Sequence, residues 1–257
     1  MTRLITVSGG KGGVGKTTVT SNLGYALSEM GVDAVVVDAN LTNPNLGFHL
    51  GIPLYPVTLH DVLKDEAHIT EATYIHNSGL RVVPAGISVD DLRETAPGNL
   101  KEVLKDTIGE PEIVLIDCAA GLGSEAVNAI EASDEVLLVT NPNLPAVTDA
   151  LKTASIAEDS GTHVLGTVLN RHEDKEHELK PREVEEMVGH PVVSVFPEED
   201  IMKESVTRKS TVIDHDPDHI ISHKFRGLAA DIAGLEYEMP DVEKGLMNRI
   251  RNMLGLK

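Results

Sequence analysis

The sequence predicts a single-domain α/β fold, in which a mostly parallel β-sheet carries helices on both faces. Three observations support this prediction. Apolar, β-branched runs alternate along the chain with helical stretches, no internal repeat is present, and 257 residues are enough for one large core. We assign residues 1–238 to the globular domain and residues 239–257 to a linker and a terminal amphipathic helix.

The first predicted strand, residues 4–7, runs into a glycine-rich loop. Residues 10–18 read GKGGVGKTT and fill the pattern G-x-x-x-x-G-K-[ST]. In this pattern, backbone N–H groups surround a phosphate chain, the lysine reaches the terminal phosphates and the hydroxyl holds Mg²⁺. A helix predicted over 19–30 follows, and helix N-termini favour anions. The residues predicted to bind a nucleoside triphosphate here are Lys11, Gly12, Gly13, Val14, Gly15, Lys16, Thr17 and Thr18.

Two further predicted strands end in aspartate. Residues 33–38 (DAVVVD) and 113–117 (IVLID) are apolar and β-branched before their last residue. Open α/β sheets bind ligands at the carboxyl ends of their strands. We therefore predict that Asp38 and Asp117 lie around Mg²⁺ together with Thr17. The alternative for Asp38 is a cap at the end of its strand.

The two lysines of the loop narrow the class of protein. The run KGGVGKTT, with Lys11 as well as Lys16, resembles the deviant Walker A loop of the MinD/ParA ATPases. This resemblance implies ATP-dependent dimerisation, with Lys11 reaching the partner's nucleotide; the alternative for Lys11 is a solvated surface cation. Asp117 resembles the family's Walker B aspartate. Residues 118–122 are similar to its second switch, usually D-x-P-A-G, although Ala119 replaces the proline.

The first switch departs from the family pattern D-x-D, because residues 38–40 read Asp-Ala-Asn. In the family the second aspartate helps to position the attacking water. Asn40 can orient a water molecule through its amide but cannot take its proton, and phosphoryl transfer depends mainly on positioning and electrostatics. We therefore expect slow, Mg-dependent ATP hydrolysis, with a non-hydrolysing nucleotide-dependent scaffold as the alternative. The predicted catalytic residues are Lys11, Lys16 and Asn40.

Two segments resemble the adenine-side elements of the family. A strand over 164–169 runs into Asn-Arg, and a strand over 192–196 runs into Pro-Glu-Glu-Asp. Asn170 has the donor and acceptor that an adenine edge needs, although asparagine after a strand is also an ordinary turn residue. The residues predicted to line the base site are Asn170, Arg171, Pro197 and Glu198.

The segment Thr-Asn-Pro at 140–142, with Asp149 beyond it, resembles the part of the family through which partner proteins reach the nucleotide site. The resemblance thus implies a regulatory protein partner, which the sequence does not name.

Charge and hydropathy restrict the partners and the location. The formal net charge of −19 weighs against a nucleic-acid partner, because duplex binding requires basic residues that neutralise phosphates. A ParA-type DNA-partitioning ATPase is therefore the less favoured alternative within the family. No apolar run has the length of a membrane span and no signal peptide precedes the first strand, so we expect a cytoplasmic protein.

Cysteine and histidine provide two checks on metal binding. The single cysteine, Cys118, excludes relatives that need pairs of cysteines for an iron–sulfur cluster or zinc. His215, His219 and His223 recur at four-residue spacing, which could present metal ligands on one helix face. However, Pro217 interrupts this run, and a polar loop before a helix over 224–232 is the ordinary interpretation.

The last residues differ in character from the body. Residues 241–257 carry a net charge of +2 against −21 for the preceding residues, and their apolar side chains recur at helical spacing. A basic amphipathic helix on an acidic body is typical of an interfacial membrane anchor; the alternative is a final helix docked on the core. The residues predicted to enter the membrane are Leu246, Ile250, Met253 and Leu254.

Together, the motifs and the tail favour a MinD-like member of the family. The resemblance then implies an ATPase that forms a homodimer with ATP and Mg²⁺, binds the anionic inner face of the cell membrane peripherally and is released on hydrolysis to ADP. The expected role is spatial positioning of a division site or of polar structures.

Overall fold

An eight-stranded sheet forms the centre of the protein, in the order β3-β4-β2-β5-β1-β6-β7-β8. The computed structural model describes residues 2–52, 55–88, 100–105 and 111–240. Within that part of the chain all neighbouring strands are parallel except β3, which pairs with β4 in the antiparallel sense. The strands are β1 (Arg3–Ser8), β2 (Ala34–Ala39), β3 (Tyr74–Ile75), β4 (Arg81–Val83), β5 (Ile113–Cys118), β6 (Glu135–Thr140), β7 (His163–Leu169) and β8 (Val192–Val195).

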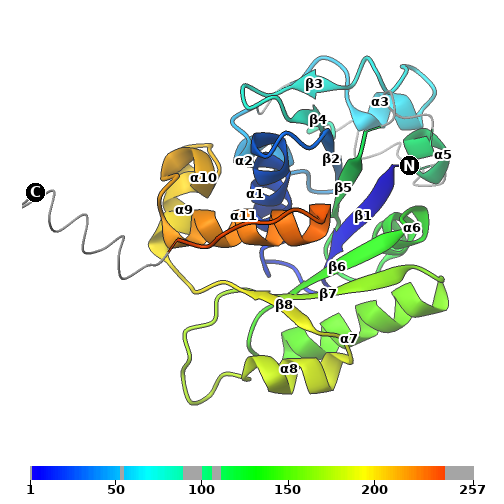
Figure 1. The fold of residues 1–257 in the computed structure, drawn as a ribbon. Helices are drawn as coiled ribbons and strands as arrows, with labels where there is room; N and C mark the ends of the chain where they lie inside the picture. Colours follow the sequence, from blue (N-terminus) through cyan, green and yellow to red (C-terminus); the bar gives the residue numbers. More distant parts are fainter. Residues whose placement is uncertain (1, 53–54, 89–99, 106–110, 241–257) are drawn as a thin grey trace, which may run out of the picture.

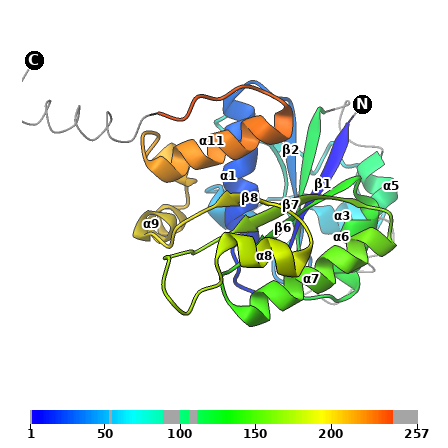
Figure 2. The same cartoon turned by 60° about the horizontal axis from the view of Figure 1, so that its bottom comes forward.

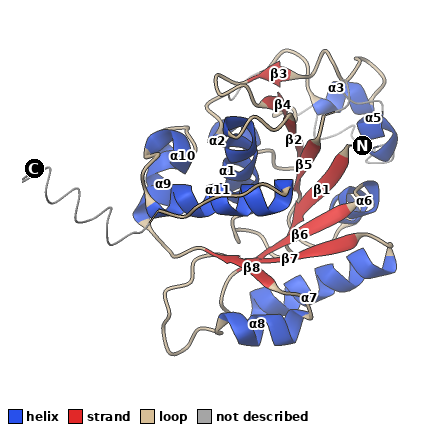
Figure 3. Cartoon of the chain, viewed as in Figure 1, coloured by secondary structure: helices blue, strands red, loops and turns tan. Residues whose placement is uncertain are grey.

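Helices cover both faces of this sheet, as Figures 1 and 3 show. They are α1 (Lys16–Glu29), α2 (Leu46–His49), α3 (Leu59–Leu63), α5 (Leu100–Lys105), α6 (Ser124–Ala132), α7 (Leu144–Asp159), α8 (Pro181–Val188), α9 (Asp200–Thr207), α10 (Val212–His215) and α11 (Ile220–Ala233). The predicted fold class, a mostly parallel α/β sheet with helices on both faces, is confirmed.

The strand sequences explain the two layers of core. Side chains alternate across a strand, so Val36 of β2 packs in the cluster beneath α1 and α11, whereas Val35 and Val37 pack in the cluster with α3, α5 and α6. A third cluster joins β6 and β7 to α7 and α8. Figure 2 shows α1 and α11 on one side of the sheet, and α7 and α8 on the other. Central parallel strands with both faces covered are expected to read as continuous apolar runs.

The structure differs from the predicted boundaries at two helices. Helix α1 begins at Lys16 rather than at residue 19, directly after Gly15, which serves as N-cap with φ 105°. Helix α11 begins at Ile220 rather than at residue 224, because the His219 ring caps it: its Nδ1 accepts a hydrogen bond from the Ile221 N–H at 3.2 Å. Histidine is not among the usual N-cap residues, so no sequence signal marked this earlier start.

The three histidines of the run at 215–223 face different partners. His215 lies 3.9 Å from Glu204, His219 lies 3.4 Å from Glu199, and Nδ1 of His223 lies 2.6 Å from the Tyr237 hydroxyl. Among the described residues, no three or more histidine, cysteine, aspartate or glutamate side chains are grouped so that they could hold an ion.

Residues 235–240 follow α11 without forming a helix or strand. Tyr237 packs against His223 of α11, which fixes this segment to the body. The predicted membrane helix, 241–257, lies outside the described residues. In the part that is described, no helix is long and apolar enough to cross a bilayer.

Candidate functional site

The glycine-rich loop lies between β1 and α1, and its glycines meet steric requirements. Gly13 and Gly15 adopt φ 78° and 105°, the left-handed region that L side chains rarely enter. Gly10 has no such constraint, but a Cβ there would lie 2.6 Å from the Asp149 carbonyl oxygen on α7. The loop can therefore turn tightly only because these positions lack side chains.

Lys16 is buried within this loop, with 7% of its surface exposed. Its Nζ lies 3.4 Å from the Lys11 carbonyl oxygen, and burial lowers the pKa of its ammonium group. The nearby charge of Asp117 offsets this loss of hydration only in part, so a further anion beside Lys16 would be stabilised. The Lys11 side chain, by contrast, is exposed.

Asp38 and Asp117 lie side by side, because β2 and β5 pair in the register that sets them opposite each other. Asp117 accepts hydrogen bonds from the Thr17 hydroxyl at 2.7 Å and from the Thr20 hydroxyl at 3.3 Å. Asp38 accepts from the N–H groups of Asn40, Asn45 and Leu46 at 3.0 to 3.2 Å.

Both carboxylates are almost completely buried. Burial raises the pKa of Asp117 to about 6, and burial together with the neighbouring Asp117 raises the pKa of Asp38 well above its ordinary value. Two buried carboxylates next to a hydroxyl form an oxygen donor set that suits a hard divalent cation such as Mg²⁺. The three residues predicted to bind the metal are thus brought together.

The loop that contains the first switch contacts the helix that follows the second switch. Asn40 bonds within its own loop: its Nδ2 donates to the Asn43 carbonyl at 2.7 Å and its Oδ1 accepts from the Asn43 N–H at 3.3 Å. Thr42, two residues after Asn40, donates to the Glu125 carboxylate on α6, the helix that follows the second switch. Cys118 is buried in the second switch, and burial raises the pKa of its thiol to about 11. The thiol therefore stays protonated at neutral pH.

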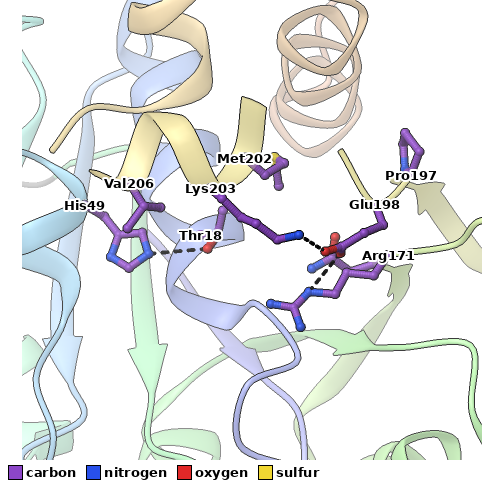
Figure 4. Close-up of a pocket in the computed structure, with 9 residues that line it drawn as sticks. Thr18, His49, Arg171, Pro197, Glu198, Met202, Lys203 and Val206 are labelled. Carbon is purple, nitrogen blue, oxygen red and sulfur yellow. Dashed lines mark hydrogen bonds and ion pairs between the residues drawn. The ribbon is translucent and has the colours of Figure 1, made fainter. Parts of the chain in front are cut away.

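A pocket of about 320 Å³ opens beside the first turn of α1 (Figure 4). All four residues predicted for the base site contribute to its lining, together with Thr18. The lining residues that the sequence did not single out are His49, Met202, Lys203 and Val206.

The walls of this pocket are held by polar contacts. Asn170 donates from Nδ2 to the Val14 carbonyl at 2.8 Å, whereas its buried Oδ1 has no hydrogen-bond partner among the described residues. Glu198 lies 3.3 Å from Arg171 and 2.7 Å from Lys203. An unsatisfied acceptor in the pocket wall is costly unless a ligand donates to it, and an adenine amino group is such a donor.

The pocket, the loop with its buried lysine and the carboxylate pair lie in one row at the carboxyl edge of a parallel sheet. This arrangement defines a P-loop nucleotide-binding protein.

Comparison with known proteins agrees with this class. Residues 2–156 match a family model described as an AAA domain, and residues 114–249 match that of the NifH/frxC family of 4Fe-4S iron sulfur cluster binding proteins. The chain is 36% identical to an uncharacterized ATP-binding protein of Methanocaldococcus jannaschii, over 91% of this chain and 89% of that protein. It is 31% identical to the septum site-determining protein MinD of Thermotoga maritima, over 99% and 98%.

Two solved structures are also similar. The MinD protein of Pyrococcus horikoshii, in complex with Mg-ADP, has a TM-score of 0.87 and 34% identity, covering 90% of this chain and 96% of that one. The Pyrococcus furiosus cell division ATPase MinD has a TM-score of 0.87 and 35% identity, covering 92% and 100%. The chain belongs to the MinD/ParA family of P-loop ATPases, as the loop motif predicted. Its single cysteine cannot supply the several thiolates of an iron–sulfur cluster.

Proposed function

We propose that this protein is a MinD-like ATPase that dimerises on ATP, binds an anionic membrane through residues 241–257 and is released on hydrolysis. By this cycle it positions a division site or a polar structure in the cell. The observation that carries the proposal is the loop with two lysines: Lys16 is buried beside the carboxylate pair, whereas the Lys11 side chain is exposed. An exposed cation at this point of the loop suits a contact with nucleotide in a second copy of the chain.

The nucleotide is ATP or ADP with Mg²⁺. Its base occupies the pocket of Figure 4, and its phosphates follow the loop from Thr18 to Lys16. Thr17, Asp38 and Asp117 hold the metal, which neutralises charge on the phosphates. The Mg-ADP in the Pyrococcus horikoshii relative supports this assignment.

Asn40 orients the attacking water in this proposal. Turnover is slow, because an amide cannot accept the proton and because both of its polar atoms bond to Asn43. The same observation favours a second candidate function, a nucleotide-dependent scaffold without turnover. Phosphate release measured with vesicles present separates the two, since only an ATPase releases phosphate above the rate of Lys16→Ala.

The membrane contact rests on the sequence of the tail. Leu246, Ile250, Met253 and Leu254 enter the lipid interface, and the basic residues among them face acidic headgroups. One such helix binds weakly, whereas the two tails of a dimer bind together through their high effective concentration. The protein is then peripheral on the inner face of the membrane.

A regulatory protein completes the cycle. Helix α7 offers a surface for it, because Leu144 and Leu151 are 59% and 39% exposed and lie seven residues apart, on one face of the helix. The same helix approaches the loop at Gly10 through Asp149, so a protein bound there would lie near the phosphates.

Vesicle sedimentation tests the proposal. The full chain should sediment with anionic vesicles in ATP and much less in ADP, and a chain truncated after residue 240 should not sediment in either. Ile250→Glu should also prevent binding, because it places a carboxylate in the apolar stripe. As a control, the truncated chain should still dimerise with ATP. Equal sedimentation of the full and truncated chains would overturn the membrane half of the proposal.

A further inference from the structure

His49 lies at the junction of the pocket and the first switch. It is the last residue of α2, it lines the pocket, and its ring is half-buried between two partners. Nδ1 lies 3.0 Å from the Asn45 carbonyl oxygen, and Nε2 lies 3.3 Å from the Thr18 hydroxyl. Figure 4 shows the ring pointing toward Thr18.

The Asn45 carbonyl fixes the tautomer of this ring. A carbonyl oxygen only accepts hydrogen bonds, so Nδ1 must carry a proton. In the neutral ring, Nε2 is therefore the acceptor, and the Thr18 hydroxyl donates to it. Burial lowers the pKa of His49, so the ring is neutral as long as no anion lies beside it.

The position of Thr18 identifies which part of the nucleotide comes nearest to His49. Thr18 belongs to the first turn of α1, two residues beyond Lys16, and it is the lining residue that joins the loop to the base pocket. If the base lies against Asn170 and Pro197 and the terminal phosphates lie against Lys16, the phosphate nearest the ribose lies at Thr18. A lone pair on Nε2 would repel that phosphate, whereas a protonated Nε2 would donate to it.

The charged surroundings of His49 permit this change. Helix α2 packs against α1 and α9. Helix α9 contributes Lys203, and the opposite wall contributes Arg171 and Glu198, whose carboxylate contacts both of these cations. From α1 the direct partner is the uncharged Thr18. With Glu198 already engaged, the bound phosphate would be the anion that charges the ring.

We propose that His49 is a nucleotide ligand that takes up a proton from solvent when the nucleotide binds and donates from Nε2 to the α-phosphate. The proposal rests on the nucleotide site proposed above. It also connects the pocket to the metal site, because the N–H of Asn45, whose carbonyl holds the ring, donates to Asp38 at 3.1 Å. His49 thus contacts the α-phosphate through Nε2 and is connected through Asn45 to Asp38, the first residue of the first switch.

Calorimetry of ADP binding tests proton uptake. Titrations at pH 7 in two buffers of different ionisation enthalpy give the number of protons taken up, for the wild type and for His49→Gln. Glutamine keeps a neutral polar group near Nε2 but does not titrate. Asp38, Asp117 and ADP also exchange protons, but they do so in both proteins and cancel in the difference. We expect the wild type to take up close to one proton more than the variant.

The affinity for ADP should also depend on pH more strongly in the wild type than in His49→Gln. Lowering the pH between 8 and 6 should strengthen ADP binding to the wild type, relative to His49→Gln, by about tenfold for each pH unit where one proton is taken up. Adenosine, which has no phosphate, should show no difference between the two proteins. His190→Gln is the matched control, because His190 pairs with Glu158 at the amino edge of the sheet and should behave as wild type.

NMR gives a third measurement, in which the protonation of His49 is followed directly in the wild type. In the wild type, the NMR titration midpoint of His49 should rise from below its ordinary value to about 8 or above when ADP is bound, as an uptake of close to one proton at pH 7 requires. Equal proton uptake by wild type and His49→Gln, or an unchanged midpoint, would overturn the proposal. Failure of the wild type to bind ADP at all would instead overturn the nucleotide site itself, so the two failures are distinguishable.

Discussion

Replacing Asp117 with asparagine should change how the stability of the protein without nucleotide depends on pH. The Asp117 side chain is fully buried and lies opposite Asp38 in the sheet. Two threonine hydroxyls and the charge of Lys16 favour its ionised form, but the loss of hydration outweighs them. The pKa of Asp117 is therefore raised from 3.8 to about 6.

The direction in which stability changes with pH follows from proton linkage. Between pH 4 and 6 the unfolded chain releases this proton while the native protein keeps it, so the free energy of unfolding falls as the pH rises through this window. A rise of about two pKa units corresponds to about 3 kcal/mol. Above pH 6 this cost is fully present, and Mg²⁺ bound with nucleotide would relieve it. An asparagine side chain in place of Asp117 would carry no such cost, and the substitution would also remove the repulsion that acts on Asp38.

Urea denaturation in EDTA at pH 4, 5, 6 and 7.5 measures this effect. The free energy of unfolding of Asp117→Asn should approach that of the wild type at pH 4 and exceed it by about 3 kcal/mol at pH 7.5. Asp159→Asn, at the exposed end of α7, controls for the loss of one negative charge and should follow the wild type. Parallel pH profiles for wild type and Asp117→Asn would refute the reasoning.

Three further predictions concern the loop and the first switch. Gly10→Ala should destabilise the protein by about 1–3 kcal/mol in thermal or urea unfolding, because its Cβ would meet the Asp149 backbone at 2.6 Å. Gly12→Ala is the control: its Cβ would come no closer than 3.6 Å to Ala120, so it should change the free energy of unfolding by less than about 0.5 kcal/mol. Equal destabilisation by Gly10→Ala and Gly12→Ala would mean that α7 does not approach the loop as described. Lys16→Ala should lower ADP affinity at least about 100-fold in calorimetry while the fold persists, since one buried charge-assisted contact is lost; unchanged affinity would contradict the phosphate assignment. Asn40→Asp should raise the rate of phosphate release and Asn40→Ala should lower it, whereas equal rates in all three proteins would show that the water is positioned elsewhere.

The sequence predicted the fold and the phosphate loop because both depend on local patterns. Strand runs that are apolar on both faces indicate a covered parallel sheet, and the spacing of Gly10, Gly15 and Lys16 indicates a loop that binds phosphate. The pairing of Asp38 with Asp117 also follows from local signals, because both residues end buried strands, although their register in the sheet had to come from the structure.

Other parts of the site depend on tertiary arrangement and carry no local signal. His49 stands in a four-residue helix, and a lone histidine there has no motif around it. Met202, Lys203 and Val206 reach the pocket because α9 follows the Pro-Glu-Glu-Asp segment and packs near α2. The start of α11 was predicted too late because a histidine ring, rather than a serine or aspartate, caps it.

The measurement that tests the central claim most directly is the mass of the full chain in solution with each nucleotide. Light scattering after gel filtration should give the mass of two chains with Mg²⁺ and a slowly hydrolysed ATP analogue, and the mass of one chain with Mg-ADP. Lys11→Ala should bind the analogue yet remain a monomer, because the exposed lysine acts on the partner's nucleotide. A single mass in all nucleotide states, with analogue binding demonstrated in the same sample, would contradict the account.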